Sequence, residues 1–249
     1  MLKLNSIRFL GKPVKVAILK RLGSLSHVVT QVPVAALTFD DGPHPQYTPG
    51  VLDILERYRA RGTFFMVGEA AQKHPDLVQR IGEAGHALGV HSWNHSSFPN
   101  LTSRERCKQM RACQEILAPY GQRLFRPPYG DQSIASRLDA LWLGYEVVVW
   151  SLDVGDWYET DSSLMASRLV KCIKPGCVVL LHDALFDEGK PHLGSKRKRK
   201  ACVDRSPMLR ALNLALDHLH HQIRFVTVPE LLHSGIPYRE FWFKKTLLG

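Results

Sequence analysis

The sequence predicts a single α/β domain folded as a distorted (β/α) barrel of seven or eight parallel strands. The length of 249 residues, 45% of them hydrophobic and 22% charged, allows a large buried core and excludes a disordered or fibrous chain. From residue 34 onward, short β-type runs alternate with helical patterns, as they do in parallel βα units. Polar residues follow most of these runs, which favours a barrel because all barrel strands end at one face.

Each element has its own local signal. Thr102 and Glu105 form a capping box ahead of a helical stripe, and Ser206-Pro207 is a favourable start for a second helix. The β runs are short, apolar and bounded by polar or turn residues. They are residues 34–39, 63–67, 86–90, 124–126, 145–151, 177–181 and 223–228.

These elements place the expected catalytic unit at residues 34–235. A basic segment at 1–33 precedes it, and a tail at 236–249 follows it. A basic, low-complexity loop is inserted at about 184–205, ahead of the helix that begins at Ser206.

The net charge of +10 is concentrated in two stretches. Residues 1–39 contain six Lys and Arg and no acidic residue, and residues 196–200 (KRKRK) add five more basic residues. The remainder of the chain is close to neutral, which argues against a nucleic-acid binder with a basic surface throughout. No nucleic-acid partner is therefore expected, and KRKRK is interpreted as a solvated loop.

A helix is expected near the start of the chain. Val14, Ile18, Leu22 and Leu25 would share one face of it, with basic residues off that face. Such a helix either packs on the barrel or lies on an anionic membrane surface, and both alternatives stay open.

The cysteines and the apolar runs indicate where in the cell the protein is expected. Five cysteines without a C-x-x-C pair indicate neither a disulfide framework nor a cysteine zinc site. No run approaches the ~18 apolar residues of a membrane helix, and Lys15 and Lys20 interrupt what would be a signal peptide's apolar region. We therefore expect a cytoplasmic protein, peripheral at most to the inner face of the membrane.

Side chains that can bind a metal ion or transfer a proton follow several of the β runs. Because barrel strands end at one face, these residues should converge on one pocket although they are far apart in sequence. Two histidines four residues apart would face the same way if their segment formed one helical turn. Together with a carboxylate they provide three ligands and leave a position for water, the pattern of a catalytic zinc site. The residues are Asp40, Asp41, His91, His95, Arg126, Asp153, Asp156, His182 and Asp183.

Five ordered motifs resemble those of the polysaccharide deacetylases, the NodB-homology carbohydrate esterases of family 4. They are TFDDGP at 38–43, HSWNH at 91–95, RPPYG at 126–130, DVGDW at 153–157 and LLHD at 180–183. The resemblance covers about residues 34–235. It implies a metal-dependent hydrolase that removes N-acetyl groups from the N-acetylhexosamine residues of a poly- or oligosaccharide, with the glycan as its partner.

The resemblance also implies a role for each site residue. Asp41, His91 and His95 would hold a divalent metal, most often zinc, which polarises the acetyl carbonyl and acidifies water. Asp40 would be the general base and Arg126 the residue that orients it. His182 would be the general acid that protonates the departing amine.

Further roles follow from the same resemblance. Asp156 would keep His182 protonated, with Asp153 as the second choice, and the backbone N–H of Tyr129 would stabilise the oxyanion. Independently of the resemblance, Asp183 is expected to cap the segment that follows it and is not counted as catalytic. Trp157, Leu180, Pro127 and Tyr129 would line the substrate site.

Two other functions stay open. One is a deacylase or deformylase of a lipid-linked sugar on the same fold, since pocket loops decide the acyl group and the sugar. The other is a glycan-binding protein whose catalytic site has lapsed, which the complete set of site residues disfavours. Sequence fixes neither the glycan, the metal nor the oligomeric state.

Overall fold

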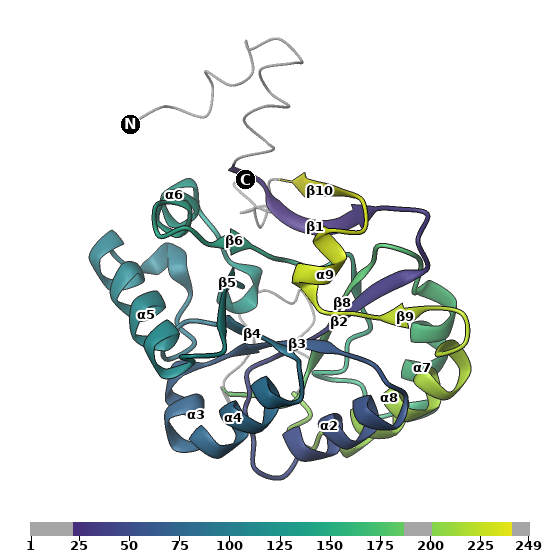
Figure 1. Ribbon diagram of the computed structural model, residues 1–249. Helices are drawn as coiled ribbons and strands as arrows, with labels where there is room; N and C mark the ends of the chain where they lie inside the picture. The colour runs from purple at the N-terminus through teal and green to yellow at the C-terminus, as the bar shows by residue number, and fades with distance from the viewer. Residues whose placement is uncertain (1–21, 187–200, 241–249) are drawn as a thin grey trace, which may run out of the picture.

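A curled parallel sheet wrapped by helices forms the body of the molecule (Figure 1). The computed structural model describes residues 22–186 and 201–240. Within them, the strand order is β6-β5-β4-β3-β2-β8-β7, β9 pairs with β2 beside this path, and every pairing in the sheet is parallel. The predicted distorted parallel barrel is confirmed. The strands are β2 (Val34–Asp40), β3 (Gly62–Met66), β4 (Ala87–Val90), β5 (Gly121–Phe125), β6 (Glu146–Val147), β7 (Leu152–Asp153), β8 (Val178–His182) and β9 (Arg224–Phe225).

The barrel closes where a single stretch of chain supplies both edges of the sheet. β6 pairs with β5 at one edge and β7 pairs with β8 at the other, although only residues 148–151 separate β6 from β7. The expected single strand at 145–151 is therefore wrong, because its first part belongs to one edge and the chain then crosses to the other. Residue 25 bridges to Val148 beside this crossing.

Side chains that alternate along β2 build two apolar layers. Val34 and Ala36 point into the barrel, in one cluster with Phe65. Leu37 and Phe39 belong to the cluster between the sheet and its helices. This alternation sends Thr38 and Asp40 toward the barrel interior at the carboxyl end of the strand.

Helices cover the outside of the sheet, and local capping explains where they begin. Thr102 and Glu105 form the predicted capping box at α5, and α8 starts at Ser206 with a proline in its first turn. Both helix predictions are confirmed. The helices are α2 (Thr48–Arg57), α3 (Gly68–Lys73), α4 (Pro75–Glu83), α5 (Ser103–Ile116), α6 (Ile134–Trp142), α7 (Ser162–Cys172), α8 (Ser206–Leu219) and α9 (Val228–Leu232), with 3₁₀ turns at Phe98–Asn100 and Pro128–Gly130.

A two-stranded antiparallel sheet extends the packed structure past both expected limits of the catalytic unit. β1 (Ser24–Val29) pairs with β10 (Ile236–Glu240). Leu25 is fully buried in β1, so its expected place on a helical face is wrong: the strand pairing takes it into the barrel core. Val14, Ile18 and residues 196–200 lie outside the described residues. In the described part of the chain, no helix combines the length and apolarity needed to cross a bilayer.

Candidate active site

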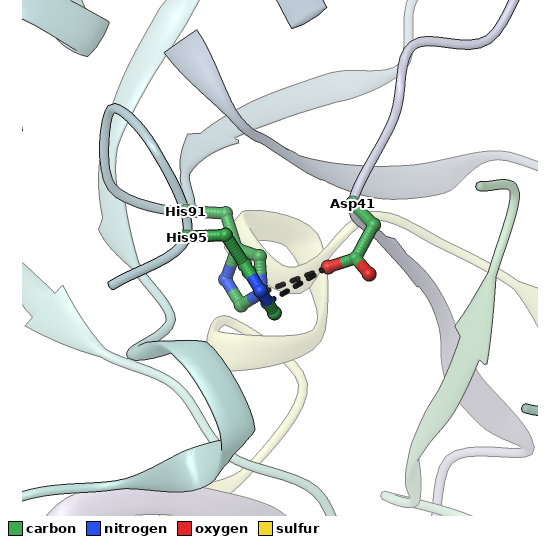
Figure 2. A group of neighbouring side chains, drawn as sticks. All are labelled: Asp41, His91 and His95. Atoms are coloured by element: carbon green, nitrogen blue, oxygen red, sulfur yellow. Dashed lines mark ion pairs between the residues drawn. The ribbon is translucent and has the colours of Figure 1, made fainter. Parts of the chain in front are cut away.

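Three side chains of the kinds that bind metal ions meet at the carboxyl ends of β2 and β4. The Nε2 atoms of His91 and His95 lie 3.3 and 3.1 Å from Oδ1 of Asp41, and all three residues are buried (Figure 2). The candidate ligand atoms lie within 4.8 Å of one another. Burial alone would raise the pKa of Asp41, but the two imidazoles hold it well below its usual range.

The surrounding hydrogen bonds orient these three side chains so that they could bind a divalent metal ion. Nδ1 of His91 donates to the carbonyl oxygen of Arg126 at 2.7 Å, which leaves Nε2 of a neutral imidazole as the ligand atom. The backbone N–H of Phe186 donates to Oδ2 of Asp41 at 3.1 Å, which leaves Oδ1 facing the histidines. Two imidazoles and one carboxylate are a donor set that zinc and similar ions accept.

The turns around the cluster have unusual backbone conformations. Among the described residues, five non-glycine residues have positive φ, and four of them are at this site: Asp41 (75°), Ser92 (68°), His95 (58°) and Tyr129 (58°). The segment from His91 to His95 is thus not the helical turn that the spacing suggested. Instead, the backbone N–H of His95 donates to Oγ of Ser92 at 2.9 Å, and this left-handed turn brings both rings to one side.

Asp40 lies beside the cluster and is held by a buried arginine. Nη1 of Arg126 is 2.7 Å from Oδ1 of Asp40, and neither side chain is more than 4% exposed. Oδ2 of Asp40 is 3.8 Å from Nε2 of His91, so the second oxygen faces the ligands. Arg126 also donates to the Thr38 hydroxyl and to the carbonyl groups of Val148 and Val149, so the surrounding barrel fixes its position.

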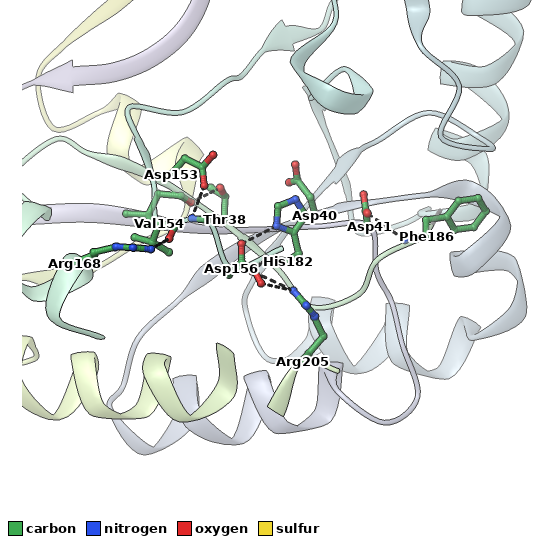
Figure 3. Close-up of polar contacts among 12 residues, drawn as sticks. Thr38, Asp40, Asp41, Asp153, Val154, Asp156, Arg168, His182, Phe186 and Arg205 are labelled. Carbon is green, nitrogen blue, oxygen red and sulfur yellow. Dashed lines mark hydrogen bonds and ion pairs between the residues drawn. The ribbon is translucent and has the colours of Figure 1, made fainter. Parts of the chain in front are cut away.

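His182 ends β8 and pairs with Asp156. Nδ1 of His182 is 2.9 Å from Oδ1 of Asp156, and the backbone N–H of His182 donates to Oδ2 at 2.8 Å (Figure 3). Burial lowers the pKa of His182, but the Asp156 carboxylate outweighs this effect and raises the pKa to about 9. Asp153 instead accepts a hydrogen bond from the backbone N–H of Gly155 at 2.7 Å, so Asp156 is the carboxylate paired with the histidine.

Arg205 is a site residue that sequence reasoning missed. It lies where a surface loop was expected, yet only 1% of it is exposed. Its Nη1 donates to the carbonyl oxygen of Asp156 at 3.0 Å and lies 3.7 Å from Oδ2 of the same residue (Figure 3). A single arginine ahead of a helix carries no motif, so no signal in the sequence could have found it.

Asp183 lies next to the candidate metal-binding residues and has a structural contact. Instead of capping the segment that follows, its buried carboxylate accepts a hydrogen bond from the hydroxyl of Thr48 at the start of α2. Burial raises the pKa of Asp183 to about 7. A Cβ atom on Gly42 would come within 2.3 Å of this carboxylate, so the turn after Asp41 requires glycine.

The structure places the residues expected to contact substrate in different surroundings. The Tyr129 ring packs against His95 with centroids 4.5 Å apart, and Pro127 beside it is buried. Leu180 is 4% exposed yet is in none of the described core clusters. Trp157 is half-buried, and its carbonyl oxygen accepts a hydrogen bond from Cys202.

Comparison with known proteins agrees with this geometry. A family model described as polysaccharide deacetylase matches residues 27–148. A peptidoglycan-N-acetylglucosamine deacetylase of Bacillus cereus is 36% identical over 222 residues, covering 86% of this chain and 96% of the relative. The chain belongs to the polysaccharide deacetylase family.

Other relatives in the family carry related names. A chitooligosaccharide deacetylase of Azorhizobium caulinodans is 31% identical over 166 residues, covering 65% of this chain and 79% of the relative. The crystal structure of a peptidoglycan N-acetylglucosamine deacetylase, 26% identical, superposes with a TM-score of 0.75 over 90% of this chain and 99% of that one. A pseudoenzyme from Bacillus anthracis, 21% identical, has a TM-score of 0.71 over 85% of this chain and 69% of that one. The fold by itself therefore does not determine whether a chain is catalytically active.

Proposed function

We propose that this chain is a divalent-metal-dependent deacetylase of N-acetylated glycans, which releases acetate and leaves a free amine on an N-acetylhexosamine. The observation that carries the proposal is the convergence of three functional units on one buried site. These units are the Asp41, His91 and His95 cluster, the Asp40–Arg126 pair and the His182–Asp156 pair. The names of the relatives, which refer to peptidoglycan and chitooligosaccharides, support this class of substrate.

The metal and Asp40 have separate tasks in this proposal. A divalent ion bound at the cluster, for which the donor set favours zinc, would polarise the acyl carbonyl and make a water molecule more acidic. Asp40 accepts the proton of the attacking water at Oδ2, because Arg126 occupies Oδ1. The arginine also places a positive charge beside this buried carboxylate.

His182 completes the reaction by donating a proton to the departing nitrogen. Asp156 binds Nδ1, so Nε2 is the atom that faces the reaction. An amine leaves readily only when protonated, and the raised pKa keeps this imidazole protonated at neutral pH. The backbone N–H of Tyr129, next to His95, is proposed to donate to the oxyanion.

Metal-dependent acetate release is the direct test. We expect purified protein to release acetate from N-acetylated chitooligosaccharides, to lose this activity after chelation, and to regain it when zinc is added back. His95→Ala should lose the bound metal, measured by elemental analysis, whereas His74→Ala, at a half-buried position between α3 and α4, should keep it. A folded, zinc-loaded protein that releases no acetate from any N-acetylated glycan would contradict the proposal.

The Asp156 carboxylate is expected to set the alkaline limit of activity. It raises the pKa of His182, so Asp156→Asn should lower that pKa and move the alkaline limb of kcat/KM to lower pH by about one unit or more. The pH profile of kcat/KM provides the measurement. Asp153→Asn removes a nearby carboxylate that bonds Gly155 rather than the ring, so it should shift the limb less. An equal shift in both variants would refute the assignment of Asp156.

A further inference from the structure

Asp156, the partner of the proposed acid His182, is held from a second side by Arg205. His182 contacts both oxygens of the Asp156 carboxylate, through Nδ1 at 2.9 Å and through its backbone N–H at 2.8 Å. Arg205 approaches from the start of α8. Its Nη1 lies 3.7 Å from Oδ2 of Asp156 and donates to the carbonyl oxygen of the same residue at 3.0 Å (Figure 3). One guanidinium therefore contacts both the side chain and the backbone of Asp156.

Burial makes this contact important for the orientation of Asp156. Arg205 and Asp156 are each only 1% exposed. The described residues provide no other donor to the Asp156 carbonyl oxygen. Without the guanidinium, this buried oxygen would lose its hydrogen bond, and His182 would be the one ion-pair partner left to the carboxylate in the described part of the chain. The carboxylate would then be oriented only by the ring that it is meant to orient.

Arg205 does not reach the substrate side of the site. Its Nε donates to the carbonyl oxygen of Val203 at 3.3 Å, and the rest of the guanidinium contacts Asp156. Because Arg205 is buried, its effect on the reaction has to pass through Asp156. A guanidinium in this place acts on the orientation of the acid rather than on the binding of the glycan.

We propose that Arg205 is a positioning residue for the protonation of the departing amine. It fixes Asp156, and Asp156 fixes Nδ1 of His182, so that Nε2 stays directed at the nitrogen that leaves. This role rests on the proposed function, in which His182 is the acid. Catalysis is sensitive to such a direction, because a misplacement of about 1 Å can lower a rate on the order of 100-fold.

The kinetics of acetate release from N-acetylated chitooligosaccharides test this role. Arg205→Met should lower kcat on the order of 10–100-fold and leave KM nearly unchanged, because the residue does not touch substrate. Arg205→Lys should recover part of the loss, since it restores the charge but not the planar fork. The matched control is Arg168→Met, which should keep nearly full kcat. It removes a partly exposed guanidinium that donates to the carbonyl oxygen of Val154 in the same loop but pairs with Glu159.

A double-mutant cycle separates positioning from a general structural role. In the His182→Ala background no acid is left to position, so adding Arg205→Met should lower kcat by less than about threefold. Circular dichroism and zinc analysis show whether each variant is folded and loaded with metal. If Arg205→Met does not fold, Arg205→Lys takes its place in the cycle.

Two results would overturn the role of Arg205 while leaving the proposed function intact. One is an unchanged kcat in Arg205→Met. The other is the same loss from Arg205→Met in the wild-type and His182→Ala backgrounds, which would show that the arginine acts independently of the acid. A wild-type protein that releases no acetate would instead refute the proposed function, and the role of Arg205 with it.

Discussion

Replacing Asp40 with asparagine is expected to lower kcat by a factor on the order of 10²–10⁴ while the metal stays bound. Asparagine has the same shape, and its Oδ1 still accepts the hydrogen bond that Arg126 Nη1 donates at 2.7 Å. The variant loses the negative charge and the carboxylate oxygen that we propose takes the proton from water. The loss should therefore appear in turnover, with little change in the fold.

Turnover at saturating zinc, combined with metal analysis, checks this result. Asp53→Asn is a suitable control, because Asp53 is an exposed carboxylate on α2 that pairs with Arg80 at the surface. Full turnover in the Asp40 variant would contradict its role as the base. Loss of the metal from that variant would instead make Asp40 a ligand, which also contradicts the proposal.

Replacing Arg126 with methionine is expected to destabilise the fold by about 3–5 kcal/mol, because one partner of a buried ion pair is left behind. Asp40 would then be a buried carboxylate without its cation. The carbonyl groups of Val148 and Val149 would lose their donors as well. Activity should fall too, since nothing would orient Asp40 toward the ligands.

Urea unfolding of matched variants measures this cost. The pair formed by Arg80 and Asp53 has nearly the same separation, 2.8 Å against 2.7 Å, but its side chains are 48% and 61% exposed. Arg80→Met should therefore lower the free energy of unfolding by no more than about 1 kcal/mol. Equal costs for Arg126→Met and Arg80→Met would show that burial does not control the strength of the Arg126 pair.

Most of the fold could be predicted because its signals are local or periodic. The capping box at Thr102 and the apolar runs of β2, β3 and β8 are readable from a few neighbouring residues. The stretch at 145–151 could not be divided correctly, because its residues suit a strand throughout. The boundary between β6, the crossing and β7 depends on pairing with β5 and β8, more than 20 residues away on either side.

The candidate site could be predicted to the extent that strand ends converge. That rule brings together Asp41, His91 and His182 without any knowledge of the turns between them. It does not give the left-handed conformations of Ser92 and His95, since neither residue type requires a positive φ. It also does not give Arg205, whose importance comes from burial against Asp156.

The crossing between β6 and β7 also has a consequence for how the enzyme acquires its activity during folding. Arg126 reaches Asp40 from 86 positions along the chain, and it is held by carbonyl groups within the crossing itself. The crossing is in turn anchored to β8, which carries His182. Contacts so distant in sequence form late, because the loops between them must first be closed at a cost in entropy. The proposed base Asp40 and the proposed acid His182 are therefore brought into place together when the barrel closes, and we expect activity to return during refolding only once closure is complete.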